Sequence, residues 1–184
     1  MSKYSTLLFS IILSACIIFA AINLSNDYTV PINVEYRDLS KPAQKQVNCL
    51  AQNILFEAGH EGKDGQIAVA MVTLNRVVSG NYADDICGVV KQKTGSTCQF
   101  SWTCEEFDRR KVSLMNSQLY KDVQKLSIYV IMNYSNMHDE TKGATYYHAH
   151  YVSPGWKLPK TTQIGQHIFY KKSTDLIMQK ELKI

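Results

Sequence analysis

The sequence predicts an α+β domain that is mainly α-helical, has a small β-hairpin element, and is preceded by an N-terminal hydrophobic helix. Three patterns lead to this fold class. Residues 7–24 carry no charge, apolar residues recur at helical spacing in several segments before residue 133, and residues from 144 onward alternate instead. Several helices around one core with a minor β element satisfy all three patterns.

Residues 1–24 are expected to act as a signal-anchor or a signal peptide. The uncharged run at 7–24 follows Lys3. This positive charge favours an N-terminus on the cytoplasmic side of the inner membrane, with the residues after 24 on the other side. Retention as an anchor is the first choice, with cleavage near Ala20 and lipidation at Cys16 as alternatives. The expected location is therefore the periplasm or the cell exterior.

Residues 25–40 are polar and are expected to form a linker, whereas residues 41–184 read as one domain. The net charge of +4 is mildly basic, and no dense run of lysine or arginine accompanies it. This charge could suit an anionic partner such as a cell-wall polymer, a membrane surface or nucleic acid, or it could simply be a slightly basic surface. No nucleic-acid partner is expected. The chain is expected to act as a monomer.

Four helices are expected in the domain, the second of them capped by Asp64. The starts are marked by Ser40 followed by Pro42, by Asp64, by Asp84 with Asp85, and by Ser117. Gly59 and Gly80 end the first two helices. In the first helix, Leu50, Ile54 and Glu57 fall on one stripe at helical spacing.

The C-terminal part is expected to be extended. Residues 144–152 alternate and are rich in tyrosine. Thr161–Ile164 and His167–Tyr170 flank a two-residue turn that begins with glycine, which predicts a small hairpin.

Four cysteines follow the hydrophobic run, and their even number outside the cytoplasm predicts two disulfides. They are Cys49, Cys87, Cys98 and Cys104. Three pairings are possible, and buried free thiols are the alternative. A zinc site fits poorly, because the sequence has no Cys-x-x-Cys spacing.

Glu57 is the candidate catalytic residue. Its carboxylate projects from the apolar stripe near the end of the first helix. We therefore expect the carboxylate to be partly desolvated, which raises its pKa. A carboxyl that holds a proton near neutral pH can act as a general acid toward a glycosidic oxygen. Its position alone leaves open an alternative, a glutamate at the rim of the stripe with its head in water.

A series of ordered motifs resembles the SleB/CwlJ-type cell wall hydrolase family. In chain order they are FEAGHEG at 56–62, GQIAVA at 65–70, LNRV at 74–77, ICGVV at 86–90, CQFSWTC at 98–104, GATYYHA at 143–149 and IGQHIFY at 164–170. The resemblance spans about residues 48–171. The cysteine-bearing motifs are similar to those of the family branch found in Gram-negative bacteria and their phages. The chain departs from the family at Gly59 and His60, which replace arginine and glycine.

The resemblance implies that residues 41–184 form a lysozyme-like cell wall hydrolase catalytic domain. It implies cleavage of peptidoglycan between N-acetylmuramic acid and N-acetylglucosamine, with the family's catalytic glutamate at Glu57 and no cofactor. Members characterised as lytic transglycosylases need one carboxylate. It protonates the leaving oxygen and then acts as base while the muramic 6-hydroxyl closes an anhydro ring.

A hydrolytic muramidase would want a second carboxylate, and Glu61 is the nearby candidate. Its position in a polar, glycine-flanked loop favours a supporting role that orders this loop or a neighbour. The groups expected to contact the sugar are Gln99, Ser101, Trp102, Tyr147 and His148. Phe100 and Phe169 are expected in the core.

The histidines suggest a metal, since His148 and His150 lie two positions apart in the extended segment. No further ligand of clear spacing follows, so no metal site is predicted. Three other functions stay open: a hydrolytic muramidase, a zinc-dependent wall amidase or peptidase, and a non-catalytic peptidoglycan-binding envelope protein. Phage lysis or bacterial wall remodelling is the expected biological role.

Overall fold

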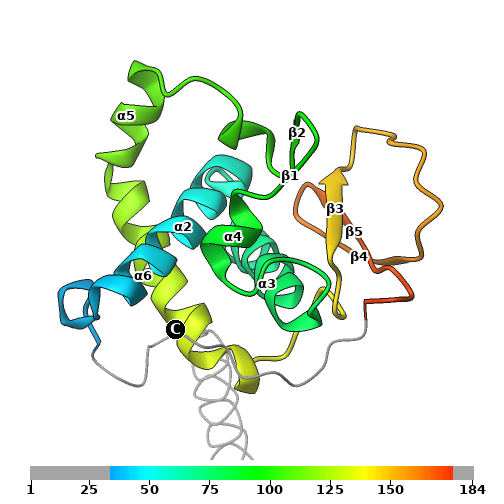
Figure 1. Ribbon diagram of the computed structural model, residues 1–184, viewed down its shortest axis with the longest axis horizontal. Coiled ribbons are helices and arrows are strands. Elements are labelled where there is room, and N and C mark those ends of the chain that lie inside the picture. The colour runs from blue at the N-terminus through cyan, green and yellow to red at the C-terminus, as the bar shows by residue number, and fades with distance from the viewer. Residues whose placement is uncertain (1–33, 176–184) are drawn as a thin grey trace, which may run out of the picture. The chain divides into compact units, whose positions relative to one another are not determined.

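The computed structural model describes residues 34–175. Its helices in Figure 1 are α2 (Lys41–Ala58), α3 (Lys63–Ser79), α4 (Ile86–Val90), α5 (Arg109–Met115) and α6 (Gln118–Asn133). Short 3-10 turns adjoin them, namely η1 (Tyr36–Asp38), η2 (Ser101–Thr103) and η3 (Tyr134–Asn136). The described residues therefore have the mainly helical α+β arrangement that the sequence predicts.

The starts of the first two helices differ in how well the sequence predicts them. Ser40 caps α2 as expected, because its Oγ accepts a hydrogen bond from the N–H of Ala43 at 3.3 Å. The predicted cap of α3 is wrong. Gly62 occupies that position, and Asp64 lies in the first turn, where its charge favours the positive end of the helix dipole. Gly80 ends α3 with a φ of 70°, a conformation that glycine adopts without strain.

The remaining helices also begin at side-chain caps. Asp85 and Ser117 cap α4 and α6, which therefore begin where the sequence predicts. Asp108 caps α5, with Oδ1 accepting from the N–H of Lys111 at 2.9 Å. The sequence does not predict α5, because this seven-residue helix buries little apolar surface and so shows no clear helical period.

The core lies where α2 contacts α3, α4 and α6 (Figure 1). Leu50 and Ile54 of α2 are fully buried there, with Leu74 of α3 and Val130 of α6. Helices on several sides of α2 thus remove its apolar stripe from water. The same packing carries the C-terminal end of α2 toward the sheet.

The described strands form two antiparallel sheets. β1 (Lys93–Thr94) pairs with β2 (Thr97–Cys98), and β3 (Tyr146–Ala149), β4 (Lys160–Ile164) and β5 (His167–Tyr170) form a sheet in the order β3-β5-β4. The predicted hairpin and the predicted extended segment are confirmed, and they are neighbours in one sheet. The β1–β2 pair is not predicted, because two-residue strands carry no periodic signal.

Two disulfides join the four cysteines of the described residues. Cys49 of α2 bonds to Cys87 of α4, with the Cα atoms 5.2 Å apart. Cys98 of β2 bonds to Cys104 after η2, with the Cα atoms 5.9 Å apart. The first bond joins two helices of the core, and the second closes a short loop beside the end of α2.

Residues 34–39 belong to the folded domain, although their polar composition predicts a linker. Tyr36 Oη accepts a hydrogen bond from Asn48 Nδ2 at 2.7 Å, and Leu39 packs against the core. The predicted hydrophobic helix at 7–24 lies outside the described residues. None of the helices that the structure describes combines the length and apolar character that a membrane crossing requires.

The two disulfides are expected to differ in their effect on stability. Replacing Cys49 and Cys87 by alanine should lower the free energy of unfolding by about 4 kcal/mol, and replacing Cys98 and Cys104 by about 2 kcal/mol. The bonds close separations of 38 and 6 residues, and a longer loop restricts the unfolded chain more. Urea denaturation followed by circular dichroism measures both losses. Equal losses would contradict the loop-length argument.

Candidate active site

Glu57 lies in the last turn of α2, where its half-buried side chain faces the sheet. Burial raises the pKa of its carboxyl above the ordinary value, and Glu105 adds a weaker effect in the same direction. The hydrogen bond from Tyr147 and the positive charge of Arg76 oppose the rise. The result is a carboxyl that holds its proton to a higher pH than an exposed glutamate does.

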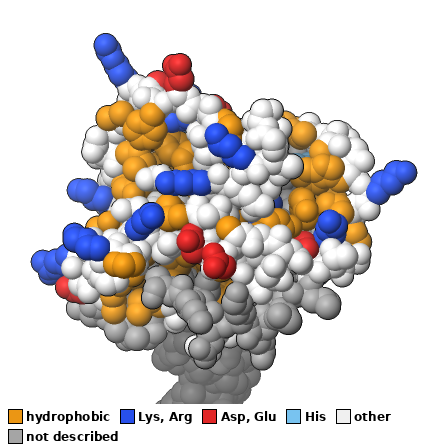
Figure 2. Space-filling view, viewed as in Figure 1, with side chains coloured by type: hydrophobic (Ala, Val, Ile, Leu, Met, Phe, Trp, Pro, Cys, Tyr) orange, Lys and Arg blue, Asp and Glu red, His pale blue; other side chains and the backbone are white. Residues whose placement is uncertain are grey.

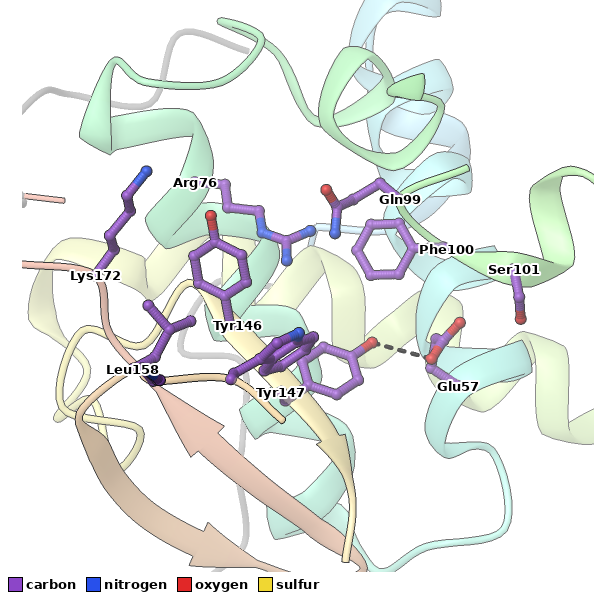
Figure 3. Close-up of a pocket in the computed structure, with 11 residues that line it drawn as sticks. Glu57, Arg76, Gln99, Phe100, Ser101, Tyr146, Tyr147, Leu158 and Lys172 are labelled. Atoms are coloured by element: carbon purple, nitrogen blue, oxygen red, sulfur yellow. Dashed lines mark hydrogen bonds between the residues drawn. The ribbon is translucent and has the colours of Figure 1, made fainter. Parts of the chain in front are cut away.

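Tyr147 of β3 is the hydrogen-bond partner of Glu57. Its Oη donates to Glu57 Oε2 at 3.1 Å, as Figure 3 shows. Burial raises the pKa of the phenol well above its usual range, so the hydroxyl stays protonated and remains a donor. The ring packs edge-on against His167 at a centroid distance of 4.9 Å, which restrains its direction.

Two clefts meet at Glu57. The first, called here the basic cleft, has a volume of about 500 Å³ and is lined by Glu57, Arg76, Gln99, Phe100, Ser101, Tyr146, Tyr147, Trp156, Lys157, Leu158 and Lys172. The second, called the α5 cleft, has about 570 Å³ and includes Phe56, His60, Glu61, Trp102, Glu105, Asp108, Arg110, Lys111, Leu114 and His148 in its lining. Glu57, Ser101 and Tyr147 line both clefts. A polymer that occupies both must therefore pass the Glu57 carboxyl.

Arg76 of α3 lines the basic cleft, and Figure 3 shows it between Tyr146 and Gln99. Its side chain is buried, and its Nε donates to the backbone oxygen of Thr145 at 2.6 Å. With the Gln99 amide oriented so that its oxygen faces the guanidinium, that oxygen accepts from both terminal nitrogens at 3.2 Å. Burial lowers the pKa of Arg76, but a guanidinium remains charged at neutral pH. The cleft thus contains a fixed positive charge near Glu57.

Gln99, Ser101 and Trp102 lie together on the loop that the second disulfide closes. Trp102 Nε1 donates to Asn53 Oδ1 at 3.1 Å, and its ring lies 4.8 Å from that of Phe56. These contacts fix the indole beside the α5 cleft. The predicted group is therefore divided, with Gln99 in the basic cleft, Trp102 in the α5 cleft and Ser101 in both.

Glu61 is held by the β4–β5 hairpin. Its Oε1 lies 2.8 Å from His167 Nδ1, and its Oε2 accepts from the N–H of Gln166 at 3.0 Å. The side chains of Glu61 and His167 are each 8% exposed. Gly65 and Gly165 lie so close to the carboxylate that a Cβ at either position would collide with it. These contacts give Glu61 the surroundings of a residue that joins the loop after α2 to the sheet.

The other histidines make protein contacts. His148 Nε2 lies 2.9 Å from Tyr170 Oη, and the two rings stack at a centroid distance of 5.2 Å. His150 Nδ1 lies 3.2 Å from the backbone oxygen of Gln166. Among residues 34–175, no group of three or more histidine, cysteine or acidic side chains is placed to hold a metal ion.

Some residues of the two clefts are absent from the sequence-based site. They are Arg76, Trp156, Lys157, Lys172 and Glu105. The LNRV motif contains Arg76, so the family resemblance carried that signal. Phe100 and Phe169 are buried, as predicted, although Phe100 also lines the basic cleft.

Comparison with known families identifies the chain. Residues 60–170 match the family described as Cell Wall Hydrolase. The chain belongs to this family. The match agrees with the SleB/CwlJ-type resemblance of the sequence, and its first residue lies just after Glu57.

Curated relatives of this cell wall hydrolase include spore cortex-lytic enzymes. The enzyme of Halalkalibacterium halodurans is 28% identical over 130 residues, which are 69% of this chain and 35% of the relative. That of Bacillus cereus is 26% identical over 132 residues, which are 70% of this chain and 45% of the relative. The chain therefore spans less than half the length of these two relatives.

A solved structure shares the fold. The catalytic domain of the germination-specific lytic transglycosylase SleB from Bacillus anthracis aligns with a TM-score of 0.50 and 25% sequence identity. The alignment covers 70% of this chain and 95% of that domain. The mainly helical α+β fold is thus that of a catalytic domain in this family.

Replacing Glu61 by alanine is expected to lower the free energy of unfolding by about 3 kcal/mol, because His167 and the N–H of Gln166 lose a buried partner. Urea denaturation measures the loss. Glu106→Ala, at an exposed position, is the matched control and should change the value by less than about 0.5 kcal/mol. Equal stability of the two variants would show that the Glu61 contacts do not hold the hairpin.

Proposed function

We propose that this chain cleaves the glycan strands of peptidoglycan between N-acetylmuramic acid and N-acetylglucosamine, as a lytic transglycosylase with Glu57 as its acid/base residue. One observation carries the proposal: a half-buried carboxyl with a raised pKa lies where two clefts meet. The likeness to a domain described as a lytic transglycosylase supports the choice of reaction.

In the first step, protonated Glu57 gives its proton to the glycosidic oxygen of the N-acetylglucosamine leaving group. The bond between this oxygen and C1 of the muramyl residue breaks, and positive charge develops at C1. Burial favours this step, because it raises the pKa of the carboxyl and so favours the protonated form that a general acid needs.

In the second step, the Glu57 carboxylate takes the proton of the muramyl 6-hydroxyl. The freed oxygen bonds to C1 and closes a 1,6-anhydro ring, so no water is consumed. Glu57 ends in its protonated form, ready for another cycle. One carboxylate is sufficient for both steps, which agrees with the contacts that tie Glu61 to the hairpin instead.

Tyr147 positions the acid. Its hydroxyl binds Glu57 Oε2, which leaves the other carboxyl oxygen to face the scissile bond. After the first proton transfer the same hydroxyl stabilises the carboxylate, because a hydrogen bond to an ionised acceptor is stronger. The positive charge of Arg76 also stabilises the Glu57 carboxylate.

Hydrolysis is a second candidate, favoured by Glu105. This carboxylate lines the α5 cleft with Glu57 and forms an ion pair with Lys111, whose Nζ lies 3.1 Å from Glu105 Oε2. A hydrolytic muramidase needs a second carboxylate, and Glu105 is better placed than Glu61 because it is not committed to the hairpin.

We also propose that the chain works outside the cytoplasm, in phage lysis or bacterial wall remodelling. Its substrate would lie beyond the inner membrane, and the uncharged run at 7–24 suits export or anchoring. Two disulfides agree with an oxidising compartment.

Replacing Glu57 by glutamine is expected to slow release of glycan fragments by about 10²–10⁴-fold, because the amide cannot transfer the proton. Mass spectrometry of the fragments from the unmodified protein should find 1,6-anhydromuramic ends. Reducing muramic ends would support the Glu105 hydrolysis candidate instead. Glu106→Gln is the matched control. Undiminished release by Glu57→Gln, with its fold intact by circular dichroism, would rule out the proposed catalytic role.

Replacing Tyr147 by phenylalanine is expected to move the alkaline limb of the pH–rate profile to higher pH. Activity requires protonated Glu57 and so falls as pH rises through its pKa, and the lost hydrogen bond is one that lowers this pKa. The maximal rate should fall about 10–100-fold, because the acid loses its orienting partner. A limb that stays in place or moves to lower pH is the contrary outcome.

A further inference from the structure

The two clefts beside Glu57 differ in charge. The basic cleft has three cationic residues, Arg76, Lys157 and Lys172, and Glu57 is the acidic residue in its lining. The α5 cleft contains acidic and basic side chains together, including Glu105 and Lys111, which pair with each other. The potential along a bound strand therefore becomes more positive toward the basic cleft.

The two lysines of the basic cleft form no ion pair with the described residues. Among the residues that the structure describes, no carboxylate lies within 4.0 Å of the charged nitrogens of Arg76, Lys157 or Lys172. Both lysines are exposed, and Figure 3 shows Lys172 and Glu57 at opposite sides of the group of lining residues. The lysine amines are thus free to meet an anion some distance from the reacting bond.

An aromatic wall lies beside these lysines. Trp156 is 42% exposed, and its ring packs edge-to-face with Tyr146 at 5.8 Å, His148 at 5.5 Å and Tyr170 at 6.0 Å between centroids. Figure 2 shows hydrophobic side chains gathered over the sheet side of the molecule, with basic side chains beside them. A restrained, partly exposed indole suits the apolar face of a sugar ring.

The two sugars of the glycan strand differ in charge. N-acetylglucosamine is neutral. The muramyl residue carries a lactyl group that ends in a carboxylate or, when a stem peptide is attached, in a peptide with carboxylates of its own. A sugar with an anionic substituent matches an aromatic wall with lysines beside it, and the neutral sugar does not use the lysines.

We propose that the end of the basic cleft formed by Trp156, Lys157 and Lys172 binds the muramyl residue of the strand, with the indole against the sugar and the lysines on its carboxylates. This inference rests on the function proposed above. It gives the strand a direction, because the muramyl C1 is the reacting carbon. The part of the strand that keeps the anhydro end lies in the basic cleft, and the leaving N-acetylglucosamine part extends into the α5 cleft.

Binding to the full-length Glu57→Gln protein tests the proposal without cleavage. Three ligands of equal length are titrated: a neutral N-acetylglucosamine tetramer, a peptide-free alternating tetramer with lactyl carboxylates, and the same tetramer with stem peptides. The Glu57→Gln protein should prefer at least one anionic tetramer over the neutral one. Adding Lys157→Gln and Lys172→Gln should weaken binding of that anionic tetramer about 5–30-fold and leave the neutral one unaffected. Lys125→Gln, an exposed lysine of α6 outside both clefts, is the matched control and should leave the preference unchanged.

The outcomes separate the two proposals. If the peptide-free tetramer binds more tightly than the neutral one, and stem peptides add nothing, the lysines bind the lactyl carboxylate. If only the peptide-bearing tetramer binds more tightly than the neutral one, the lysines bind the peptide. A preference that survives in the lysine variant overturns the inference, as does equal binding of all three ligands, while the proposed function stands in both cases. If no ligand binds and the unmodified protein releases no fragments, the proposed function fails and the inference fails with it.

Discussion

Two buried polar side chains of α3 attach the sheet to the helices, and the site depends on this attachment. Asn75 Nδ2 donates to the backbone oxygen of Ala144 at 3.0 Å, and Arg76 Nε donates to that of Thr145 at 2.6 Å. These bonds fix the chain just before β3 begins. Tyr147 follows two residues later, and its hydroxyl can reach the carboxyl on α2 because the strand starts at this point.

Arg76 therefore has two consequences that act against each other at the site. As a hydrogen-bond donor it brings β3 toward α2, and this closeness buries Glu57 and raises the pKa of its carboxyl. As a positive charge it lowers the same pKa. The two effects of Arg76 on the pKa of Glu57 thus have opposite signs, and burial is the larger of the causes that act on this carboxyl.

The sequence predicts the elements of this fold better than their contacts. The apolar stripe on residues 41–58 identifies both α2 and its buried carboxyl, because helical spacing places Glu57 above Ile54. The role of Tyr147 is not visible in the same way. Alternation predicts its strand, but which side chain a strand residue meets depends on packing between segments 90 residues apart. The Cys49–Cys87 pairing, the burial of Arg76 and the shape of the two clefts depend on such distant contacts too.

The glycines around Glu61 link three distant positions into one unit. A methyl group at residue 65 or 165 would occupy the space of the Glu61 carboxylate, and residue 165 also has a φ of 54°. Substitution at any one of the three is therefore not independent of the others. Homologous chains should therefore keep Glu61, Gly65 and Gly165 together or lose them together, so these three positions should change jointly in evolution.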